Sequence, residues 1–330
     1  MSNSPNKDLI IELKVLLDEA KFGSDKNDKF RVKSYKTAIE KIGLMTTKIV
    51  NESDIPLTKG GKIYLKIKEF LEKGHIDKTR EILATNESIL DIYRDLQKIA
   101  EIGPVKAKEL VETHGIRSIE ELNARQDLLN DKQKIGLKYW ETDCLRIPRN
   151  EIKKHEKIYQ SAIKLTPSLM DVRISINGSY RRGANDSGDI DILLTHPSNN
   201  MNSFKTFVDK LLSQSYLIDT LAYGEKKYMG YGKLFSANGI PRRIDIIYCP
   251  PNEYPFAQLY FTGCGSFNVR MREYASSKGY RLNEKGLIDL KTNKFVEYKF
   301  VEEKDIFEFL GLSYVEPINR IETYIFHSLE

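Results

Sequence analysis

Two aspartates one residue apart are the residues of this sequence best suited to chemistry. Asp189 and Asp191 lie in GDIDILL, at the head of an apolar run. Because side chains alternate across a strand, both acids face one side and the neighbouring isoleucines face the other. Two carboxylates that close repel each other unless a divalent cation lies between them. The spacing therefore predicts a Mg²⁺ site.

A third acid strengthens this prediction, since Asp-x-Asp alone is also common at exposed strand ends. Asp245 lies in RRIDIIY, another apolar strand that can pair beside the first. Three carboxylates from two strands are what two Mg²⁺ ions held roughly 3.5–4 Å apart require, and Mn²⁺ can replace them. We expect Asp189, Asp191 and Asp245 to be catalytic metal ligands, with Asp245 assisting deprotonation of the attacking hydroxyl.

The segment before the acids has residue types that bind phosphate. In GSYRRGANDSGD, Gly178 permits close backbone approach, Ser179 offers a hydroxyl, and Arg182 offers a fork of donors matched to phosphate oxygens. Gly188 can add a backbone N–H. A surface turn with solvated arginines is the alternative interpretation, but the position directly before the acids favours phosphate binding. The sequence lacks the Gly-x4-Gly-Lys-Ser/Thr loop of hydrolysing nucleotide-binding folds.

Composition indicates several small domains in a reducing, intracellular environment. The chain has 330 residues, 40% of them hydrophobic, and a net charge of +5. Between Lys21 and Lys78 there are 14 Lys and Arg against 8 Asp and Glu, so this segment is the first candidate for contact with phosphate. The three cysteines have no Cys-x-x-Cys spacing, and no apolar run approaches the length needed to span a membrane.

The chain is expected to be helical first and mixed later, which is typical of an α+β protein. Apolar residues recur at three and four positions from Leu9 to about Ala84, and a second helical block continues to about Tyr139. Within the first block, the segment KIYLKIKEFLEKG ends at Gly74, which is expected to cap its helix. After a break around 146–149, the segments VRISI, DIDILL, KYMGYGKLF and RRIDIIY predict strands, with a helix in SFKTFVDKLLSQ.

The segment GSYRRGANDSGDIDILLTHP, followed by GEKKYMG, RRIDI and YFTG, resembles the catalytic core of family X DNA polymerases, most closely the beta type. The resemblance is collinear from about Leu9 to Arg320. It implies a flexible tail (1–8), a helical lyase-like DNA-binding domain (9–86) and a helix-hairpin-helix DNA-binding subdomain (87–147). A nucleotidyltransferase-type palm on a mixed sheet (148–259) and an α/β nucleotide-selection subdomain (260–330) would follow.

The resemblance also implies nucleotide contacts on both sides of the acids. They are Arg146, Ser179, Arg182 and Gly188 for the triphosphate, and Tyr260, Phe261, Gly263 and Asn268 for the sugar and base. Arg243 and Arg272 are expected to contact DNA, the latter with Glu284 as its acidic partner. Aromatic packing before a turn is the alternative interpretation of YFTG. Cys264, Gly265 and Val269 depart from the more polar residues of the family.

Two hairpins are expected to bind the DNA backbone. IAEIGPVKAKEL has the form of a helix-hairpin-helix, in which the backbone N–H groups near Gly103 and Val105 face a phosphate. A plain helical connection is the alternative. The earlier hairpin keeps Gly60 but has Leu57-Thr58 where the family has Pro-Gly. In the family such hairpins bind Na⁺ or K⁺, which we expect here more firmly at the second hairpin.

One lysine stands where the family forms a Schiff base with a 5′-deoxyribose phosphate. Lys66 occupies that position, and the 5′-phosphate and lyase-pocket positions fall on Arg31, Tyr35, Lys62 and Lys78. Without the resemblance, these lysines would simply be solvated. Leu65 replaces a residue that is usually acidic, which we expect to slow the lyase step.

The sequence therefore predicts a monomeric, template-directed DNA polymerase that fills short gaps in base excision repair, with 5′-deoxyribose-phosphate lyase activity. Its partners would be gapped or nicked duplex DNA and dNTPs, in the nucleus, cytoplasm or virion and not at a membrane. The sequence has no BRCT-like module before Leu9, which disfavours the larger end-joining members. The alternatives are a template-independent nucleotidyltransferase, disfavoured by the short link SANGIP, and a catalytically weak DNA-binding scaffold, disfavoured by the three acids.

Overall fold

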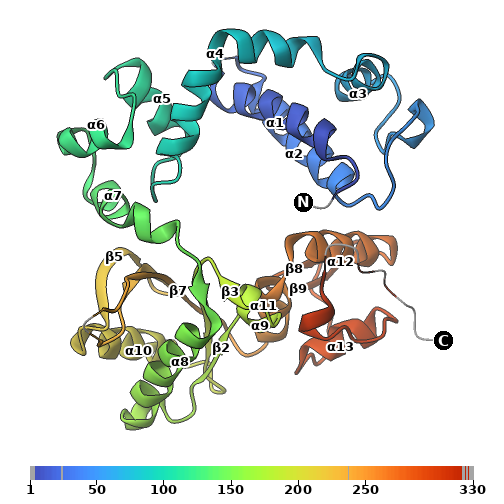
Figure 1. Ribbon diagram of the computed structural model, residues 1–330. Helices are drawn as coiled ribbons and strands as arrows, with labels where there is room; N and C mark the ends of the chain where they lie inside the picture. The colour runs from blue at the N-terminus through green and yellow to red at the C-terminus, as the bar shows by residue number, and fades with distance from the viewer. Residues whose placement is uncertain (1–3, 24, 237, 322–323, 325, 327–330) are drawn as a thin grey trace. The chain divides into compact units, whose positions relative to one another are not determined.

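The computed structural model describes residues 4–23, 25–236, 238–321, 324 and 326. Its chain divides into two compact units, Met1–Lys138 and Tyr139–Glu330. The regular elements of the first unit are helices (Figure 1). They are α1 (Lys7–Phe22), α2 (Asp28–Gly43), η1 (Glu52–Asp54), α3 (Lys62–Lys73), α4 (Asp77–Leu96), α5 (Pro104–Glu112), α6 (Ile119–Ala124), η2 (Gln126–Leu128) and most of α7 (Asp131–Asp143).

Helix α1 forms the centre of the first unit because its apolar residues recur at three and four positions. Leu9, Leu13 and Leu16 are buried, and the helix packs against α2 and α4. It begins at Lys7, before the expected start, and the buried side chain of Asn6 donates to the Thr47 carbonyl at 3.0 Å. Part of the segment expected to be a flexible tail is thus ordered, and residues 1–3 lie outside the described residues.

The predicted end of α3 is confirmed. Gly74 has a left-handed backbone (φ 75°), and its N–H donates to the Phe70 carbonyl at 2.8 Å. A residue with a Cβ is strained in that conformation, which is why glycine ends the helix. The connection before α3 has only the short helix η1 as regular structure.

The second unit is built on a five-stranded sheet in the order β2-β4-β7-β6-β5. Its elements are β1 (Ile147–Pro148), α8 (Arg149–Lys164), η3 (Pro167–Leu169), β2 (Arg173–Ile176), α9 (Gly178–Arg181), β3 (Asp186–Ser187), β4 (Ile190–Thr195), α10 (Asn202–Ser213), β5 (Leu217–Tyr223), β6 (Lys227–Gly232), β7 (Arg242–Tyr248), α11 (Tyr254–Thr262), α12 (Gly265–Ser277), β8 (Tyr280–Asn283), β9 (Gly286–Asp289), α13 (Glu303–Phe309) and η4 (Pro317–Asn319). Strands β4 and β7 are parallel, and the other pairs are antiparallel, so the sheet is mixed, as predicted.

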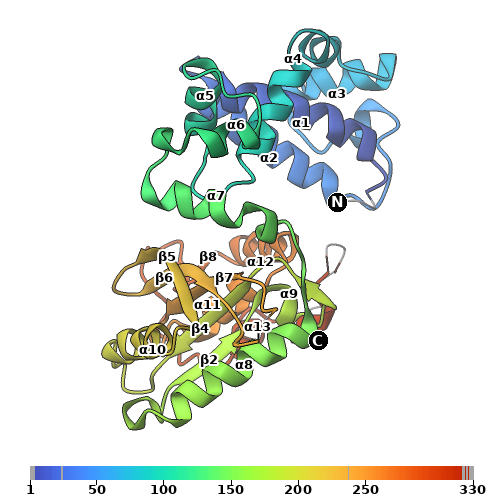
Figure 2. The ribbon, with the colours of Figure 1, turned by 60° about the vertical axis from the view of Figure 1, so that its left-hand side comes forward.

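Helices α8 and α10 cover one face of this sheet (Figures 1 and 2). Ile190, Ile192, Ile244 and Ile246 point into the core between sheet and helices and are almost fully buried. Alternation along a strand therefore sends the intervening residues of β4 and β7 to the opposite face. The acids of interest belong to that opposite face.

A second core lies between α11, α12, α13 and the β8–β9 hairpin. A buried ionic group connects this core to α9. Both guanidinium nitrogens of Arg181 donate to Glu303, at 3.0 and 2.6 Å, and Arg320 donates to the same carboxylate at 2.8 Å. Among the described residues, no helix is both long and apolar enough to cross a lipid bilayer.

Candidate active site

Asp191 and Asp245 are direct partners across the parallel strands β4 and β7. Asp189 immediately precedes β4 and lies two residues before Asp191, so it is directed to the same side. The structure thus brings the three acids together on the sheet face opposite α8 and α10. On the other face of the sheet, the buried isoleucines of β4 and β7 pack in the core, and this burial fixes the register of the two strands.

The proximity of the acids alters their acidity. Burial raises the pKa of Asp191 to about 7, and the neighbouring carboxylates of Asp189 and Asp245 contribute to the rise. Partial burial of its carboxylate and the charge of Asp245 also raise the pKa of Asp189, although the residue lies at the exposed head of the strand. The site is therefore short of positive charge.

Two cations stand beside the third acid. Arg243 Nε donates to Asp245 Oδ1 at 2.9 Å, and Lys227 Nζ lies 3.8 Å from Asp245 Oδ2. Arg243 was expected to contact DNA, and here it pairs with a predicted metal ligand. In the part of the chain that the structure describes, no three His, Cys, Asp or Glu side chains are arranged to enclose a metal ion.

The residues expected to bind phosphate form a short helix, α9, instead of an open loop. Gly178 begins it with φ 59°, and a Cβ at that position would lie 3.2 Å from Asp191 Oδ2. Glycine thus satisfies both the backbone conformation and the close approach to the acid. The N–H of Asn177 donates to the Asp191 carbonyl at 2.8 Å, which ties the start of α9 to β4.

The four predicted triphosphate contacts lie around this helix, and local hydrogen bonds hold the side chains of Arg146, Ser179 and Arg182. Arg182 donates to the Thr262 carbonyl at 2.5 Å, next to Gly263, and Ser179 donates to Ser187 Oγ at 2.8 Å. Arg146 is exposed and pairs with Asp186 at 2.7 Å, and a Cβ at Gly188 would lie 3.2 Å from its guanidinium. The structure therefore brings Arg146 beside Gly188 and Arg182 beside Gly263.

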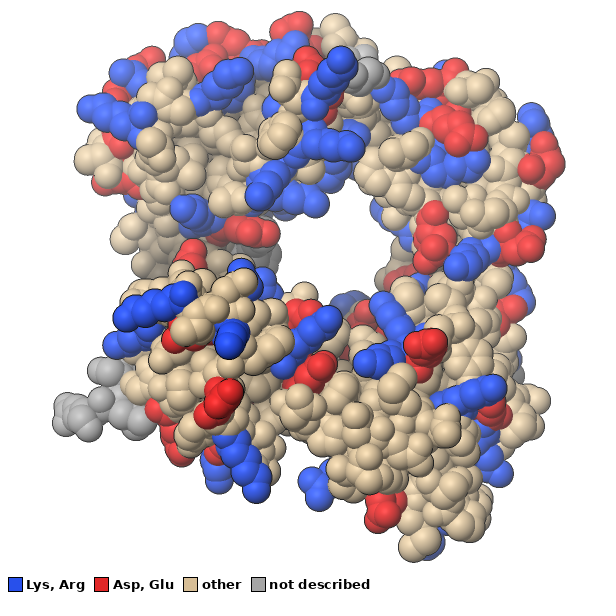
Figure 3. Space-filling model, turned by 180° about the vertical axis from the view of Figure 1, so that it is seen from behind, with Lys and Arg blue, Asp and Glu red and all other residues tan. Residues whose placement is uncertain are grey.

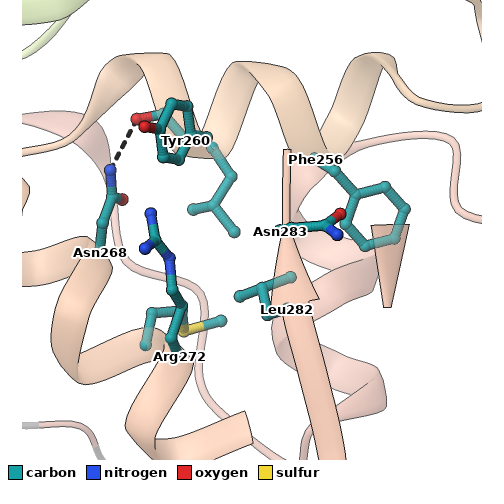
Figure 4. Close-up of a pocket in the computed structure, with 8 residues that line it drawn as sticks. Phe256, Tyr260, Asn268, Arg272, Leu282 and Asn283 are labelled. Carbon is teal, nitrogen blue, oxygen red and sulfur yellow. Dashed lines mark hydrogen bonds between the residues drawn. The ribbon is translucent and has the colours of Figure 1, made fainter. Parts of the chain in front are cut away.

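The predicted sugar, base and template residues converge on α11 and α12 (Figure 4). Asn268 donates to the Tyr260 carbonyl at 2.7 Å, and the Arg272 guanidinium lies 5.2 Å from the centre of the Tyr260 ring. Phe261 meets Tyr260 edge to face at 5.1 Å. Tyr260, Asn268 and Arg272, together with Phe256, Leu282 and Asn283, line a cavity of about 10 Å³. Arg272 and Glu284 are both described, and they form no ion pair with each other.

The two predicted hairpins place helix N-termini without acidic neighbours. Helix α3 begins after Gly61 and α5 after Gly103, and neither of these described helices has an acid in its first turn. Val105, in the first turn of α5, is 84% exposed, which is unusual for an apolar side chain. On the face seen in Figure 3, Lys and Arg gather in the middle of the N-terminal unit, with fewer Asp and Glu among them. Positive N-termini and basic side chains are suited to bind phosphate.

The lysines of α3 divide into paired and unpaired groups. Lys68 pairs with Glu52 at 2.6 Å, and Lys73 lies 3.5 Å from Glu69. Within the described part of the chain, Lys62 and Lys66 have no acidic partner. They lie one turn apart, and Lys66 is half-buried.

The remaining lyase-pocket residues are less free. Arg31 pairs with Asp28 at 2.7 Å and also with Glu19, and Lys78 lies 3.2 Å from Glu81. Tyr35 is buried, one turn after Arg31, and burial raises its pKa. Of the predicted group, Lys62 and Lys66 are therefore the cations best placed to accept an incoming phosphate or sugar.

Several residues beside the acids were not expected from sequence. Lys227 approaches Asp245, and Tyr231 donates its hydroxyl to Asp143 at 2.6 Å. Asn283 lines the cavity next to Arg272. Alternation along KYMGYGKLF was the one available signal for Lys227 and Tyr231, because odd positions of that strand share a face.

Most of the chain matches family models. Residues 146–251 match the model of the DNA polymerase beta palm, and residues 257–321 match that of the DNA polymerase beta thumb. Residues 94–142 match the fingers domain of DNA polymerase lambda. The matched segments follow one another along the chain without overlap.

Curated relatives agree with these models. The chain is 33% identical over 277 residues to DNA polymerase lambda of Rattus norvegicus, covering 79% of this chain and 47% of the relative. It is 32% identical over 309 residues to DNA polymerase lambda of Arabidopsis thaliana, with coverages of 87% and 57%. It is 28% identical over 293 residues to a DNA nucleotidylexotransferase of Xenopus laevis, with coverages of 77% and 56%. The chain thus spans about half the length of these relatives.

Proposed function

Because the chain belongs to the family X DNA polymerases, we propose that it adds deoxynucleotides opposite a template to a primer 3′-OH and so fills short gaps in DNA. The observation that carries the proposal is the direct pairing of Asp191 with Asp245, with Asp189 beside them. Carboxylates in that arrangement serve transfer of a nucleotidyl group, with release of pyrophosphate. Gap filling of this kind belongs to base excision repair.

The three acids fit a pair of divalent cations. Burial and mutual repulsion raise the pKa values of Asp189 and Asp191, and a cation would relieve that repulsion. When bound, two Mg²⁺ ions, or Mn²⁺ in their place, would lower the pKa of the primer hydroxyl and neutralise charge on the triphosphate. Asp189, Asp191 and Asp245 would hold these ions.

The chain itself would bind and orient the nucleotide. The guanidinium groups of Arg182 and Arg146, with Ser179 and Gly188, would donate to the triphosphate oxygens. Arg182 would then exchange its present acceptor, the Thr262 carbonyl, for phosphate. On the other side, Tyr260, Phe261, Gly263 and Asn268 would contact the sugar and base, and Arg272 the template.

The N-terminal unit would hold the DNA by its backbone. The N-termini of α3 and α5 begin near the exposed Gly60 and Gly103 and have no acid in their first turns, and Na⁺ or K⁺ would support the contact there. Lys66, unpaired within the described residues, would attack C1′ of a 5′-deoxyribose phosphate and form a Schiff base with loss of water. β-Elimination would then break the bond from C3′ to the DNA phosphate, and hydrolysis of the imine would release the sugar. Arg31, Tyr35, Lys62 and Lys78 would surround the 5′-phosphate.

Template-independent addition is the second candidate, because one relative is named a DNA nucleotidylexotransferase. The connection between β6 and β7 runs only from Lys233 to Pro241, which leaves little chain to stand in for a template strand. This observation favours the template-directed reaction.

One experiment separates these possibilities. The protein is incubated with a one-nucleotide gapped duplex bearing a 5′-deoxyribose phosphate, with and without Mg²⁺, and any imine is trapped with borohydride. We expect Mg²⁺-dependent insertion of the complementary dNTP and a trapped adduct formed without Mg²⁺. If a single strand without template were extended as well as the gapped duplex, template-independent addition would replace the proposed reaction. Extension without an adduct would leave a polymerase in which Lys66 has no lyase role.

A further inference from the structure

A row of side chains crosses the palm sheet beside the catalytic acids. Asp219 on β5 pairs with Tyr231 on β6, and Tyr231 pairs with Arg243 on β7. Direct cross-strand partners lie on one face of a sheet, so these three side chains share a face. Asp245 follows Arg243 by two residues on β7 and belongs to the same face.

The last turn of α7 binds this row at two points. The hydroxyl of Tyr139 donates to Asp219 Oδ2 at 2.5 Å, and the hydroxyl of Tyr231 donates to Asp143 Oδ2 at 2.6 Å. The rings of Tyr139 and Tyr231 lie 4.1 Å apart, centre to centre. Tyr231 is completely buried. Its hydroxyl is satisfied by Asp143, and the ring of Tyr139 packs against its face.

Arg243 connects the row to the acids. Its guanidinium carbon lies 6.0 Å from the centre of the Tyr231 ring, at the outer limit of a cation–π contact, and its Nε donates to Asp245 Oδ1 at 2.9 Å. Removing the Tyr231 hydroxyl would leave the Asp143 carboxylate without its donor and release the ring. Arg243 would then lose a fixed surface to lie against, and Asp245 would lose a fixed partner.

We propose that Asp143 and Tyr231 are positioning residues for nucleotidyl transfer. The hydrogen bond between them fixes the Tyr231 ring against Arg243, and Arg243 in turn orients Asp245 toward the metal ions. This inference rests on the proposed function, in which Asp245 is a metal ligand. Neither residue is among the predicted metal or nucleotide ligands. Their effect reaches the reaction through Arg243, as outer partners of metal ligands commonly do.

A matched control lies on the same strand. Tyr228 is also completely buried, and its hydroxyl lies 3.2 Å from Thr220 Oγ1. It belongs to the opposite face of β6, toward α8 and α10, where it cannot reach Arg243. That hydroxyl also donates to the backbone carbonyl of Asp219 at 3.3 Å, so Tyr228→Phe removes a comparable buried hydroxyl while every side-chain hydrogen bond of the row stays in place.

The test measures metal binding directly. Free Mn²⁺ is followed by electron paramagnetic resonance while the full chain is titrated, for wild type, Tyr231→Phe, Asp143→Ala, their double variant and Tyr228→Phe. We expect the Kd for Mn²⁺ to rise roughly 3- to 10-fold in both single variants, toward the low end of the effect of outer partners. The double variant should be no weaker than the singles, and Tyr228→Phe should stay within about twofold of wild type, because separate buried hydroxyls act independently.

Two further readouts separate positioning from folding. Asp143→Asn keeps an acceptor for the Tyr231 hydroxyl, so it should recover most of the Mn²⁺ affinity. In gap filling, kcat should fall in Tyr231→Phe while KM for the dNTP stays unchanged. The fluorescence of Trp140, the one tryptophan of the chain, verifies that each variant is folded at the assay temperature.

Unchanged Mn²⁺ affinity in Tyr231→Phe and Asp143→Ala, or an equal loss in Tyr228→Phe, would overturn the inference. Failure of the proposed function would look different. A wild-type protein that binds Mn²⁺ with this pattern of variants but extends no primer would refute polymerase activity and leave intact the role of Asp143 and Tyr231 in orienting Asp245 for metal binding.

Discussion

Asp191 and Asp245 are direct register partners on the adjacent parallel strands β4 and β7. Adjacent strands lie about 4.8 Å apart, so two carboxylates in that relation interact strongly. The structure records the consequence, since burial and the neighbouring acids raise the pKa of Asp191 to about 7. An acid site with such repulsion is suited to divalent cations.

Replacing Lys66 should separate the two proposed activities. Lys66→Ala should abolish borohydride-trapped adducts, because the amine of this half-buried lysine, which has no acidic partner among the described residues, is the proposed nucleophile. Gap filling should stay within about twofold of wild type, since the palm is unchanged. Lys68→Ala is the control, because Lys68 lies on the same helix but pairs with Glu52. Undiminished trapping by Lys66→Ala would remove Lys66 from the mechanism.

Replacing Arg182 should weaken nucleotide binding. A charge-assisted hydrogen bond is worth about 1.5–3 kcal/mol, so Arg182→Ala should raise the Kd for the dNTP roughly 10- to 100-fold. Pre-steady-state gap filling measures this Kd. Arg173→Ala, which removes an exposed arginine at the start of β2, should have little effect. A wild-type Kd in Arg182→Ala would mean that Arg182 serves only its bond to the Thr262 carbonyl.

Replacing Glu303 should destabilise the second unit. Glu303 is buried between Arg181 and Arg320, and Glu303→Gln would leave two arginines without their carboxylate. Breaking a buried ion pair from one side costs about 3–5 kcal/mol. Urea denaturation followed by Trp140 fluorescence should show this loss, and Glu308→Gln, at an exposed site on α13, should not. A loss equal to that of the control would contradict the structure of this ionic group.

Stability of the second unit should fall in mild acid because of His155. Burial lowers its pKa to about 4 from the ordinary 6.5, and its Nδ1 lies 2.6 Å from the Tyr216 hydroxyl. The unfolded chain takes up the proton first, so stability present above pH 6.5 is lost as the pH falls toward 4. That difference in pKa, at about 1.4 kcal/mol for each pH unit, limits the loss to about 3 kcal/mol.

The same denaturation assay checks the His155 prediction. His155→Gln can still hydrogen-bond Tyr216 but takes up no proton, so its stability should depend less on pH between 6.5 and 4.5. The difference between the two proteins removes the contribution of ordinary carboxylates. Parallel stability curves for wild type and His155→Gln would show that the imidazole does not titrate as its burial implies.

Local patterns were sufficient to predict the acid face of the sheet. In DIDILL and RRIDIIY, apolar residues alternate with acids, and burial of the isoleucines leaves one register for the two strands. The cap at Gly74 was predictable for a similar reason, since the periodic run ends there and glycine accepts the left-handed conformation.

Contacts between distant segments were not predictable in the same way. The hydrogen bond from Tyr231 to Asp143 joins residues 88 positions apart, and it depends on where the last turn of α7 meets the sheet. Strand β5 was missed because LIDTLAY has two register shifts against β6, which blur its alternation. The resemblance implied a DNA contact for Arg243 and gave no sign of its hydrogen bond to Asp245, although the spacing of the two residues places both on one face of the strand.

The carboxylate of Asp245 provides the most direct test of the account. Asp245→Ala and the control Asp171→Ala, an exposed acid of the same unit, are compared in Mg²⁺-dependent filling of a one-nucleotide gap under single-turnover conditions. We expect the rate of Asp245→Ala to fall at least about 1000-fold, because the substitution removes a negatively charged metal ligand. Asp171→Ala should keep the wild-type rate. Retention of more than about a tenth of wild-type activity by Asp245→Ala would contradict the proposal that Asp245 is a catalytic metal ligand.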